Sequence, residues 1–203
     1  MTADFLYDFG SPNAYLAWRV LPGIEERTGT KFTLRPVLLG GLFKLTGNQS
    51  PMAAFAAIPA KLAYQRREME RFVARHGLSR FAMNPHFPVN TLGAMRGAVA
   101  ADAEGVLPAY SEAMFAAMWE QGLDLADPPV LARAIADAGL PAERLFAAAQ
   151  QQPVKDRLIA DTNAAAARGV FGLPTLIVDG ELYFGKDRLD EVEFVLAGAR
   201  TAA

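Results

Sequence analysis

Segments typical of β-strands lie near the two ends of this chain and are separated by a long stretch of different character. Residues 3–9 (ADFLYDF) mix aromatic and apolar side chains, and residues 31–39 (KFTLRPVLL) alternate and are partly β-branched. Residues 173–185 (LPTLIVDGELYFG) form two short apolar runs around Asp179-Gly180, which predicts a hairpin with a type I′ turn. Strand pairs this small are not stable alone. We therefore expect both ends of the chain to join in one sheet.

Helices are predicted beside these strands. Ser11 suits the N-cap and Pro12 the first turn of a helix that runs to about Thr28, with Gly29 at its C-terminal end. A βαβ unit of this kind favours parallel strands. A last helix, about residues 187–198, carries an apolar stripe made of Leu189, Val192, Val195 and Leu196.

The middle of the chain predicts helices instead of strands. It is rich in Ala, Leu, Met, Glu and Arg, with prolines near the expected helix starts and glycines after several ends. The expected helices span residues 60–76, 91–104, 107–121, 128–138, 141–151 and 153–168. The fold class is therefore α/β, with a thioredoxin-like βαβ…ββα core formed by residues 1–40 and 169–203. Residues 41–168 form a large all-helical insertion in this core.

Composition excludes several classes of function. The net charge of −2 and pI near 5.7 argue against nucleic acid or an anionic membrane as a partner. No apolar run approaches the roughly 18 residues of a membrane-spanning helix, and residues 1–9 do not read as a secretory signal, so we expect a cytoplasmic protein. The sequence has no cysteine, which excludes disulfides and catalysis by a protein thiol. No spacing links the two histidines as metal ligands.

Several separated stretches together resemble a known family. They are DFGSPNAYLA at residues 8–17, PVLLGGLFKLTGN at 36–48 and GVFGLPTLIVDGELYFGKDRL at 169–189, with helices inserted between them. The chain resembles 2-hydroxychromene-2-carboxylate isomerases and the related kappa-class glutathione transferases over almost its whole length. The resemblance implies glutathione as a cofactor, a small aromatic substrate, and a homodimer. Many relatives have an aromatic residue at the position of Asn13, and asparagine there favours the isomerase branch of the family.

Ser11 is the candidate catalytic residue. Taken alone, a serine here is a helix cap worth about 1 kcal/mol. Redox relatives of the fold carry Cys-x-x-Cys where this sequence has Ser11-Pro12-Asn13-Ala14, so dithiol exchange is impossible here. The resemblance implies that the Ser11 hydroxyl and the first amides of the helix face a glutathione sulfur. A hydrogen bond and a helix N-terminus can lower the pKa of that thiol without a basic side chain.

Leu173-Pro174 is the second candidate. Because most peptide bonds before proline are trans, these two residues alone predict a trans bond. The resemblance implies a cis bond, with the backbone amide and carbonyl of Leu173 free to bind the cysteinyl backbone of glutathione, as in strand addition.

Four further residues complete the candidate glutathione site. Taken alone, Lys186 and Asp187 belong to a run of solvated charged residues, with Asp187 as the cap of the last helix. The resemblance implies instead that Asp187 binds the γ-glutamyl ammonium of glutathione. Asn48 alone is a turn residue and Lys61 an exposed helix lysine. By resemblance both lie near glutathione, and Lys61 meets the carboxylate of its glycyl group or of a substrate.

The function that the resemblance implies is a glutathione-dependent cis–trans isomerase. It converts 2-hydroxychromene-2-carboxylate to trans-o-hydroxybenzylidenepyruvate, a step of aromatic-compound degradation. Two alternatives stay open: a kappa-class-like transferase that conjugates small electrophiles, and a non-catalytic glutathione-binding protein.

Overall fold

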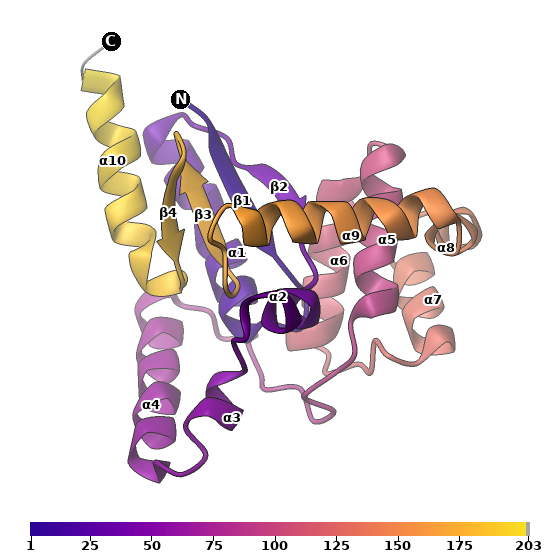
Figure 1. Cartoon of the computed structure of the whole chain (residues 1–203), viewed down its shortest axis with the longest axis horizontal. Helices are drawn as coiled ribbons and strands as arrows, with labels where there is room; N and C mark the ends of the chain where they lie inside the picture. The colour runs from indigo at the N-terminus through magenta and orange to yellow at the C-terminus, as the bar shows by residue number, and fades with distance from the viewer. Residues whose placement is uncertain (202–203) are drawn as a thin grey trace.

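The computed structural model describes the backbone of residues 1–201 and the side chains of residues 1–198. Within this part of the chain, a four-stranded sheet has the order β2-β1-β3-β4. Its strands are β1 (Ala3–Tyr7), β2 (Thr33–Pro36), β3 (Thr175–Val178) and β4 (Glu181–Phe184). β2 is parallel to β1, whereas β3 is antiparallel to both β1 and β4. The two ends of the chain therefore form one mixed sheet, as predicted (Figure 1).

Helices account for most of the rest of the chain. They are α1 (Pro12–Thr28), α2 (Leu39–Thr46), α3 (Pro51–Ala54), α4 (Pro59–His76), α5 (Leu92–Ala103), α6 (Leu107–Trp119), α7 (Pro128–Asp137), α8 (Ala142–Ala149), α9 (Gln152–Ala167), the short 3-10 helix η1 (Lys186–Arg188) and α10 (Leu189–Thr201). Helices α5 to α8 pack against one another beside the sheet, and α3 and α4 project from its lower end (Figure 1).

The sheet separates two apolar clusters because successive strand residues point to opposite faces. Phe5 and Tyr7 of β1 face a large core that includes α1, α10, α5 and α6. Leu6 faces a smaller cluster with Val37, residues of α2 and α9, and Leu173. Helices α2 and α9 lie in front of the sheet and α1 behind it (Figure 1).

The predicted elements at the chain ends are confirmed, with shorter strands. The first helix begins at Pro12 and ends before Gly29, whose φ of 70° places it in the left-handed region. Asp179 and Gly180 have φ values of 45° and 94°, as a type I′ turn requires. The expected last helix begins with η1 before continuing as α10. The expected helices of the middle stretch are all found, with ends shifted by a few residues.

Helices α2 and α3 were not predicted. The α2 segment, LGGLFKLT, contains two glycines and is preceded by Leu38, which offers no side-chain cap. Helix propensity alone therefore disfavours it. Packing supplies what the local sequence lacks: Leu42 is fully buried, and the amides of Leu38 and Leu39 are bound by side chains distant in the sequence.

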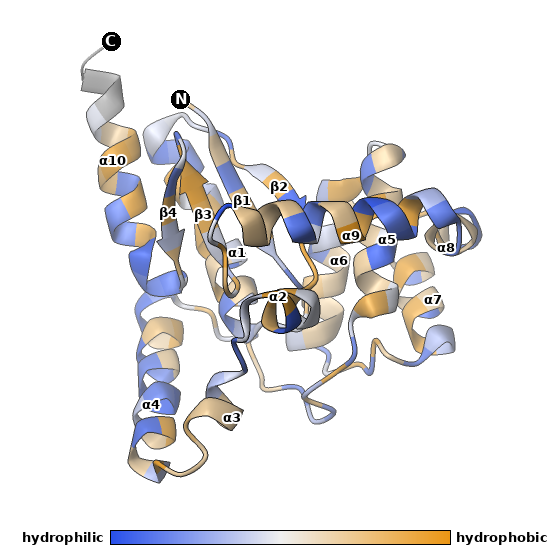
Figure 2. Cartoon of the chain, in the orientation of Figure 1, coloured by the Kyte–Doolittle hydropathy of each residue, from blue (hydrophilic) through white to orange (hydrophobic). Residues whose placement is uncertain are grey.

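Hydropathy varies sharply between elements (Figure 2). The strand β3 is buried along its length. In contrast, α4 buries no residue, although it carries apolar side chains. No helix of the described residues is long and apolar enough to cross a membrane.

Candidate active site

Ser11 lies in the turn between β1 and α1 and caps α1, as predicted. Its Oγ accepts a hydrogen bond from the Ala14 amide at 3.2 Å, and its backbone has extended dihedrals. The same hydroxyl donates to the carbonyl oxygen of Leu173 at 3.0 Å. Ser11 is only 4% exposed, whereas Pro12 and Asn13 reach the surface in part. The hydroxyl is therefore held just below the surface, at the N-terminus of α1.

Leu173 and Pro174 meet Ser11 directly, and the peptide bond between them is cis, as expected. The expectation that both backbone groups of Leu173 are free is wrong for the carbonyl, because the Ser11 hydroxyl occupies it. Within residues 1–198, the Leu173 amide has no hydrogen-bond partner. Pro174 in turn accepts a hydrogen bond from Gly185, which ties this segment to the end of β4.

Asp8 is a buried carboxylate beside the Ser11 turn and was not predicted as a site residue. Its Oδ1 accepts from the Gly10 amide at 2.8 Å and from the Thr91 hydroxyl at 2.6 Å, and its Oδ2 accepts from the Leu39 amide at 2.8 Å. Burial raises the pKa of Asp8, and these three hydrogen bonds oppose the rise. The signal in the sequence was an acidic residue that directly follows the run Phe5-Leu6-Tyr7.

Lys186 and Asp187 lie at the start of η1 and pair with each other through Lys186 Nζ and Asp187 Oδ1. The Lys186 ammonium lies 4.8 Å from the centre of the Phe72 ring of α4. The side chain of Lys186 is 5% exposed, whereas that of Asp187 is 66% exposed. The reading of this segment as a solvated charge run is therefore wrong for Lys186.

Asn48 follows α2 and contacts the segment that leads to Leu173. Its Nδ2 donates to the Phe171 carbonyl at 2.8 Å, and its Oδ1 accepts from the Gln49 amide. It also lies close to Gly172: a Cβ built on that glycine would be 3.9 Å from Asn48 Nδ2. Asn48 therefore binds the chain at Phe171, two positions before Leu173.

Lys61 is not joined to the other candidates by any contact among the described residues. Its Nζ lies 3.5 Å from the centre of the Phe55 ring, at the far end of α4 from Phe72. The separation along the helix is about 16 Å at 1.5 Å per residue. Lys61 and Lys186 therefore mark opposite ends of α4.

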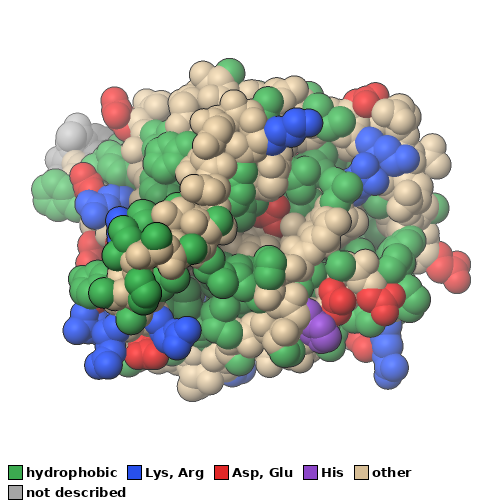
Figure 3. Space-filling model, turned by 60° about the horizontal axis from the view of Figure 1, so that its bottom comes forward, with side chains coloured by type: hydrophobic (Ala, Val, Ile, Leu, Met, Phe, Trp, Pro, Cys, Tyr) green, Lys and Arg blue, Asp and Glu red, His purple; other side chains and the backbone are tan. Residues whose placement is uncertain are grey.

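The face that carries α2, α3 and the lower part of α4 is hollowed near its centre, with hydrophobic side chains along much of the border (Figure 3). Met118 and Trp119 are fully buried in the core and do not reach this hollow. Met52, in α3, is instead 57% exposed.

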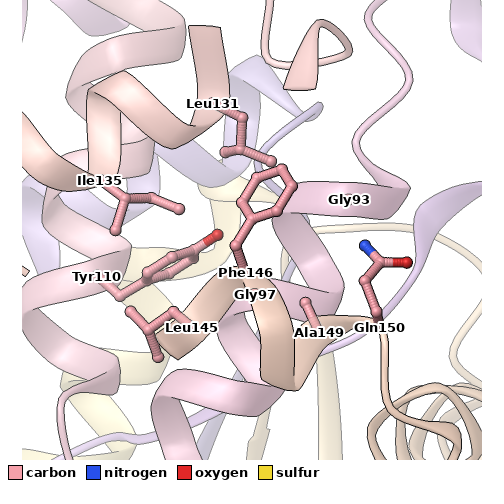
Figure 4. A pocket seen from close by; sticks show the side chains of 9 residues that line it. All are labelled: Gly93, Gly97, Tyr110, Leu131, Ile135, Leu145, Phe146, Ala149 and Gln150. Atoms are coloured by element: carbon pink, nitrogen blue, oxygen red, sulfur yellow. The ribbon is translucent and has the colours of Figure 1, made fainter. Parts of the chain in front are cut away.

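Cavities among the described residues also lie elsewhere, and two of them can be compared with the candidate site. One has a volume of about 20 Å³, between α5, α6, α7 and α8, and is lined by Tyr110, Leu131 and their neighbours (Figure 4). This is about the space of a single water molecule, so it is too small for a substrate. The other, of about 240 Å³, lies between α1, β2 and the start of α6 and includes Trp18 and Phe32. Neither cavity is lined by a predicted site residue.

The fold and this turn define a class: a thioredoxin-like domain in which a serine stands at the helix start, in a chain without cysteine. The sequence model of the DSBA-like thioredoxin domain family matches residues 2–197, and the chain belongs to this family. The family match covers the sheet and the inserted helices together.

Individual relatives point to two activities. The chain is 30% identical to glutathione S-transferase kappa 1 of Rattus norvegicus, over 95% of this chain and 89% of the relative. It is 29% identical to the 2-hydroxychromene-2-carboxylate isomerase of Sphingobium xenophagum, over 96% and 97% of the two chains. A solved structure of a 2-hydroxychromene-2-carboxylate isomerase superposes with a TM-score of 0.84 at 25% identity, covering 98% of this chain and 96% of that one. The expected resemblance is thus confirmed for both groups.

Proposed function

We propose that this protein is a glutathione-dependent cis–trans isomerase that converts 2-hydroxychromene-2-carboxylate to trans-o-hydroxybenzylidenepyruvate, in the degradation of aromatic compounds. The observation that carries the proposal is the pairing of the Ser11 hydroxyl with the Leu173 carbonyl at the N-terminus of α1, in a chain without cysteine. A reactive sulfur must then come from a ligand.

The residues of the site fit glutathione. The Leu173 amide, which has no hydrogen-bond partner among residues 1–198, is a donor for the carbonyl of a cysteinyl residue, and the N-terminus of α1 favours an anion. When bound, glutathione supplies a thiolate that adds reversibly to the conjugated double bond of the open-chain substrate, which allows rotation about that bond. Ser11 stabilises the sulfur, and Asp187 holds the γ-glutamyl ammonium beside the buried Lys186. Asn48 supports the segment at Phe171, and Lys61 binds a carboxylate.

The contribution of Ser11 can be estimated from its contacts. Its hydroxyl has one proton, which the Leu173 carbonyl accepts in this structure. Donating it to a thiolate exchanges a neutral hydrogen bond of about 1 kcal/mol for a charge-assisted one of about 1.5–3 kcal/mol. The helix N-terminus adds about 0.3–2 kcal/mol. Together these terms lower the pKa of a thiol by about one to two units, from about 8.5 to about 7.

A conjugating transferase is the second candidate, favoured by the similarity to the kappa-class relative. It uses the same thiolate but releases a thioether. An absorbance assay of 2-hydroxychromene-2-carboxylate, with and without glutathione, separates the candidates. We expect isomerisation only with glutathione, which is recovered unchanged. Conjugation of an alkyl or aryl halide without isomerisation would indicate the transferase, and glutathione binding with no turnover would indicate a binding protein.

We also propose a cytoplasmic homodimer, with the exposed apolar side chains of α2 to α4 at the interface. Leu45, Met52, Ile58 and Tyr64 are each more than half exposed, and α4 buries no residue in the isolated chain. Light scattering should give twice the chain mass. Tyr64→Glu should reduce it to one chain mass, whereas Phe194→Glu, at a 79% exposed position of α10, should leave the dimer intact. A monomeric wild type would reject the proposal.

A further inference from the structure

Asp8 is a buried carboxylate that the proposed chemistry does not use. It is 1% exposed and lies directly after β1, before the turn that carries Ser11. A buried carboxylate is costly unless hydrogen bonds compensate for lost hydration. Three donors reach the side chain, and the backbone oxygen of Asp8 also accepts from the Ser11 amide at 3.1 Å.

The three side-chain donors come from three different segments. The Gly10 amide belongs to the Ser11 turn, the Leu39 amide begins α2, and the Thr91 hydroxyl lies at the start of α5. In neither helix does the residue at the N-cap position make a side-chain cap bond, although Asn90 Oδ1 accepts from the Leu92 amide at the start of α5. Leu38 offers none to α2, and Thr91, a residue type that commonly caps helices, makes no cap bond to α5. Asp8 therefore binds donors that the local sequence leaves available.

The packing around Gly10 brings the same segments into close contact. A Cβ built on Gly10 would lie 3.2 Å from Thr91 Cγ2 and 3.4 Å from Asp8 Oδ1. The turn, the carboxylate and Thr91 thus fit together with little free space. The Asp8 carboxylate holds the Gly10 amide, and the Asp8 backbone oxygen holds the Ser11 amide, so both amides of the turn are tied to this residue.

We propose that Asp8 is a positioning residue: its carboxylate joins the Ser11 turn, the start of α2 and the start of α5, and so sets the direction of the Ser11 hydroxyl. The effect on catalysis rests on the proposed function, whereas the effect on the turn does not. Of the three donors to Asp8, Thr91 can be changed most conservatively, because valine has nearly the same shape and no hydroxyl.

The ionised form of Asp8 suits the arrangement best, since all three contacts are donors. Protonation places a hydrogen where one donor points, so the turn should loosen as Asp8 takes up a proton. Tyr7, the neighbouring residue on β1, is also titratable: burial raises its pKa, the charge of Asp8 raises it further, and its hydroxyl is paired with Ser111 at 2.6 Å. The groups that face Asp8 from the turn, α2 and α5 do not titrate.

The test compares Thr91→Val with Thr91→Ser, which keeps the hydroxyl. Amide hydrogen exchange of the protein without glutathione reports on the turn. In Thr91→Val we expect faster exchange at Gly10, Ser11 and Leu39 by at least tenfold, with β4 amides unchanged. Thr91→Ser should match the wild type. With glutathione and the hydroxychromene, the acid limb of kcat/KM should move to higher pH in Thr91→Val only, because Asp8 loses a hydrogen bond that lowers its pKa.

Each result has a distinct meaning. Exchange that rises equally at all amides, or not at all, would overturn the positioning role. Faster amide exchange confined to the turn, without a shift in the acid limb of the kcat/KM profile, would overturn the link to catalysis. A wild type that neither binds glutathione nor turns over the substrate would reject the proposed function, while the exchange measurements would still decide whether Asp8 positions the turn.

Discussion

At the scale of single residues, Ser11 is held by two hydrogen bonds that serve different ends. The bond from Ala14 caps α1, and the bond to Leu173 joins residues 162 positions apart in the sequence. The first contact follows from local sequence, because serine before proline is typical of helix starts. The second depends on how β3 approaches β1, so the sequence around Ser11 does not predict it.

Replacing Ser11 by alanine should therefore have two separable effects. The free energy of unfolding should fall by about 1–3 kcal/mol through loss of the cap and of the hydrogen bond to the Leu173 carbonyl. The kcat/KM for the glutathione-dependent reaction should fall about tenfold, since the net gain from a hydrogen bond to thiolate is about 1–1.5 kcal/mol. Steady-state kinetics and urea unfolding measure the two.

Ser50→Ala provides the matched control. Ser50 caps α3 in the same Ser-Pro arrangement, with its Oγ accepting from the Ala53 amide at 3.3 Å, but does not contact Leu173. This variant should keep the wild-type kcat/KM. An equal loss of activity in both variants would show that capping, and not the contact with sulfur, explains the effect of Ser11.

At the scale of elements, α2 is held by long-range contacts. Thr162 of α9 accepts from the Leu38 amide at 3.2 Å and donates to the Leu158 carbonyl at 2.7 Å, so its side chain is fixed in place. A Cβ built on Gly41 would lie 2.9 Å from Thr162 Cγ2, whereas one on Gly40 would meet nothing within 4 Å. These two neighbouring glycines therefore have different roles.

We expect Gly41→Ala to lower the free energy of unfolding by about 1–3 kcal/mol, because α2 must move away from α9. Gly40→Ala should instead raise it by up to about 1 kcal/mol through higher helix propensity. Urea unfolding of both variants measures the difference. Equal effects of the two alanines would contradict the close approach of α2 and α9.

A second contact between elements joins α1 to α6 through charge. Glu112 accepts from Trp18 Nε1 at 2.8 Å and from Arg19 at 2.6 Å. Burial raises the pKa of Glu112, but the hydrogen bonds from Trp18 and Arg19 outweigh burial, and the net pKa lies below its ordinary value of 4.5. A lowered pKa stabilises the folded state above the unfolded pKa, and this stabilisation disappears as pH falls through the folded pKa.

Glu112→Gln should therefore be less stable than the wild type by about 1 kcal/mol at neutral pH, an estimate reduced for the half-exposed side chain. The difference should shrink as the pH falls below about 4.5. Thermal unfolding of both proteins across this range is the measurement. A difference that is constant with pH would exclude the charge of Glu112 as its cause.

At the scale of the whole molecule, the joining of both chain ends in one sheet followed from simple physical limits. Neither the first two strands nor the hairpin at Asp179 can form a stable sheet alone, so their union was predictable. Helix α2 was missed because its stability depends on the burial of Leu42 and on contacts with Asp8 and Thr162, which its helix propensity does not reveal. The burial of Lys186 was missed because Phe72, which covers it, belongs to a distant helix. The division of the chain at residues 40 and 169 stays a prediction.

Glutathione binding should stabilise the whole fold, since the site joins the two ends of the chain. At about 100 times the dissociation constant, the free energy of unfolding should rise by about 2.7 kcal/mol. For a domain of this size, this corresponds to a rise in Tm of roughly 5–10 °C. Thermal unfolding with glutathione, and with S-methylglutathione as a ligand whose sulfur cannot ionise, measures it. No rise with millimolar glutathione would contradict binding.

The ionisation of bound glutathione can be measured directly from the ultraviolet absorbance of the thiolate as pH is varied. Because Ser11 and the N-terminus of α1 favour the anion, the titration midpoint of the complex should lie about one to two units below the value of about 8.5 for a free thiol. In Ser11→Ala it should return upward by about one unit. A midpoint equal to that of free glutathione, or unchanged in Ser11→Ala, would contradict the role of Ser11 as the group that stabilises the ligand's sulfur.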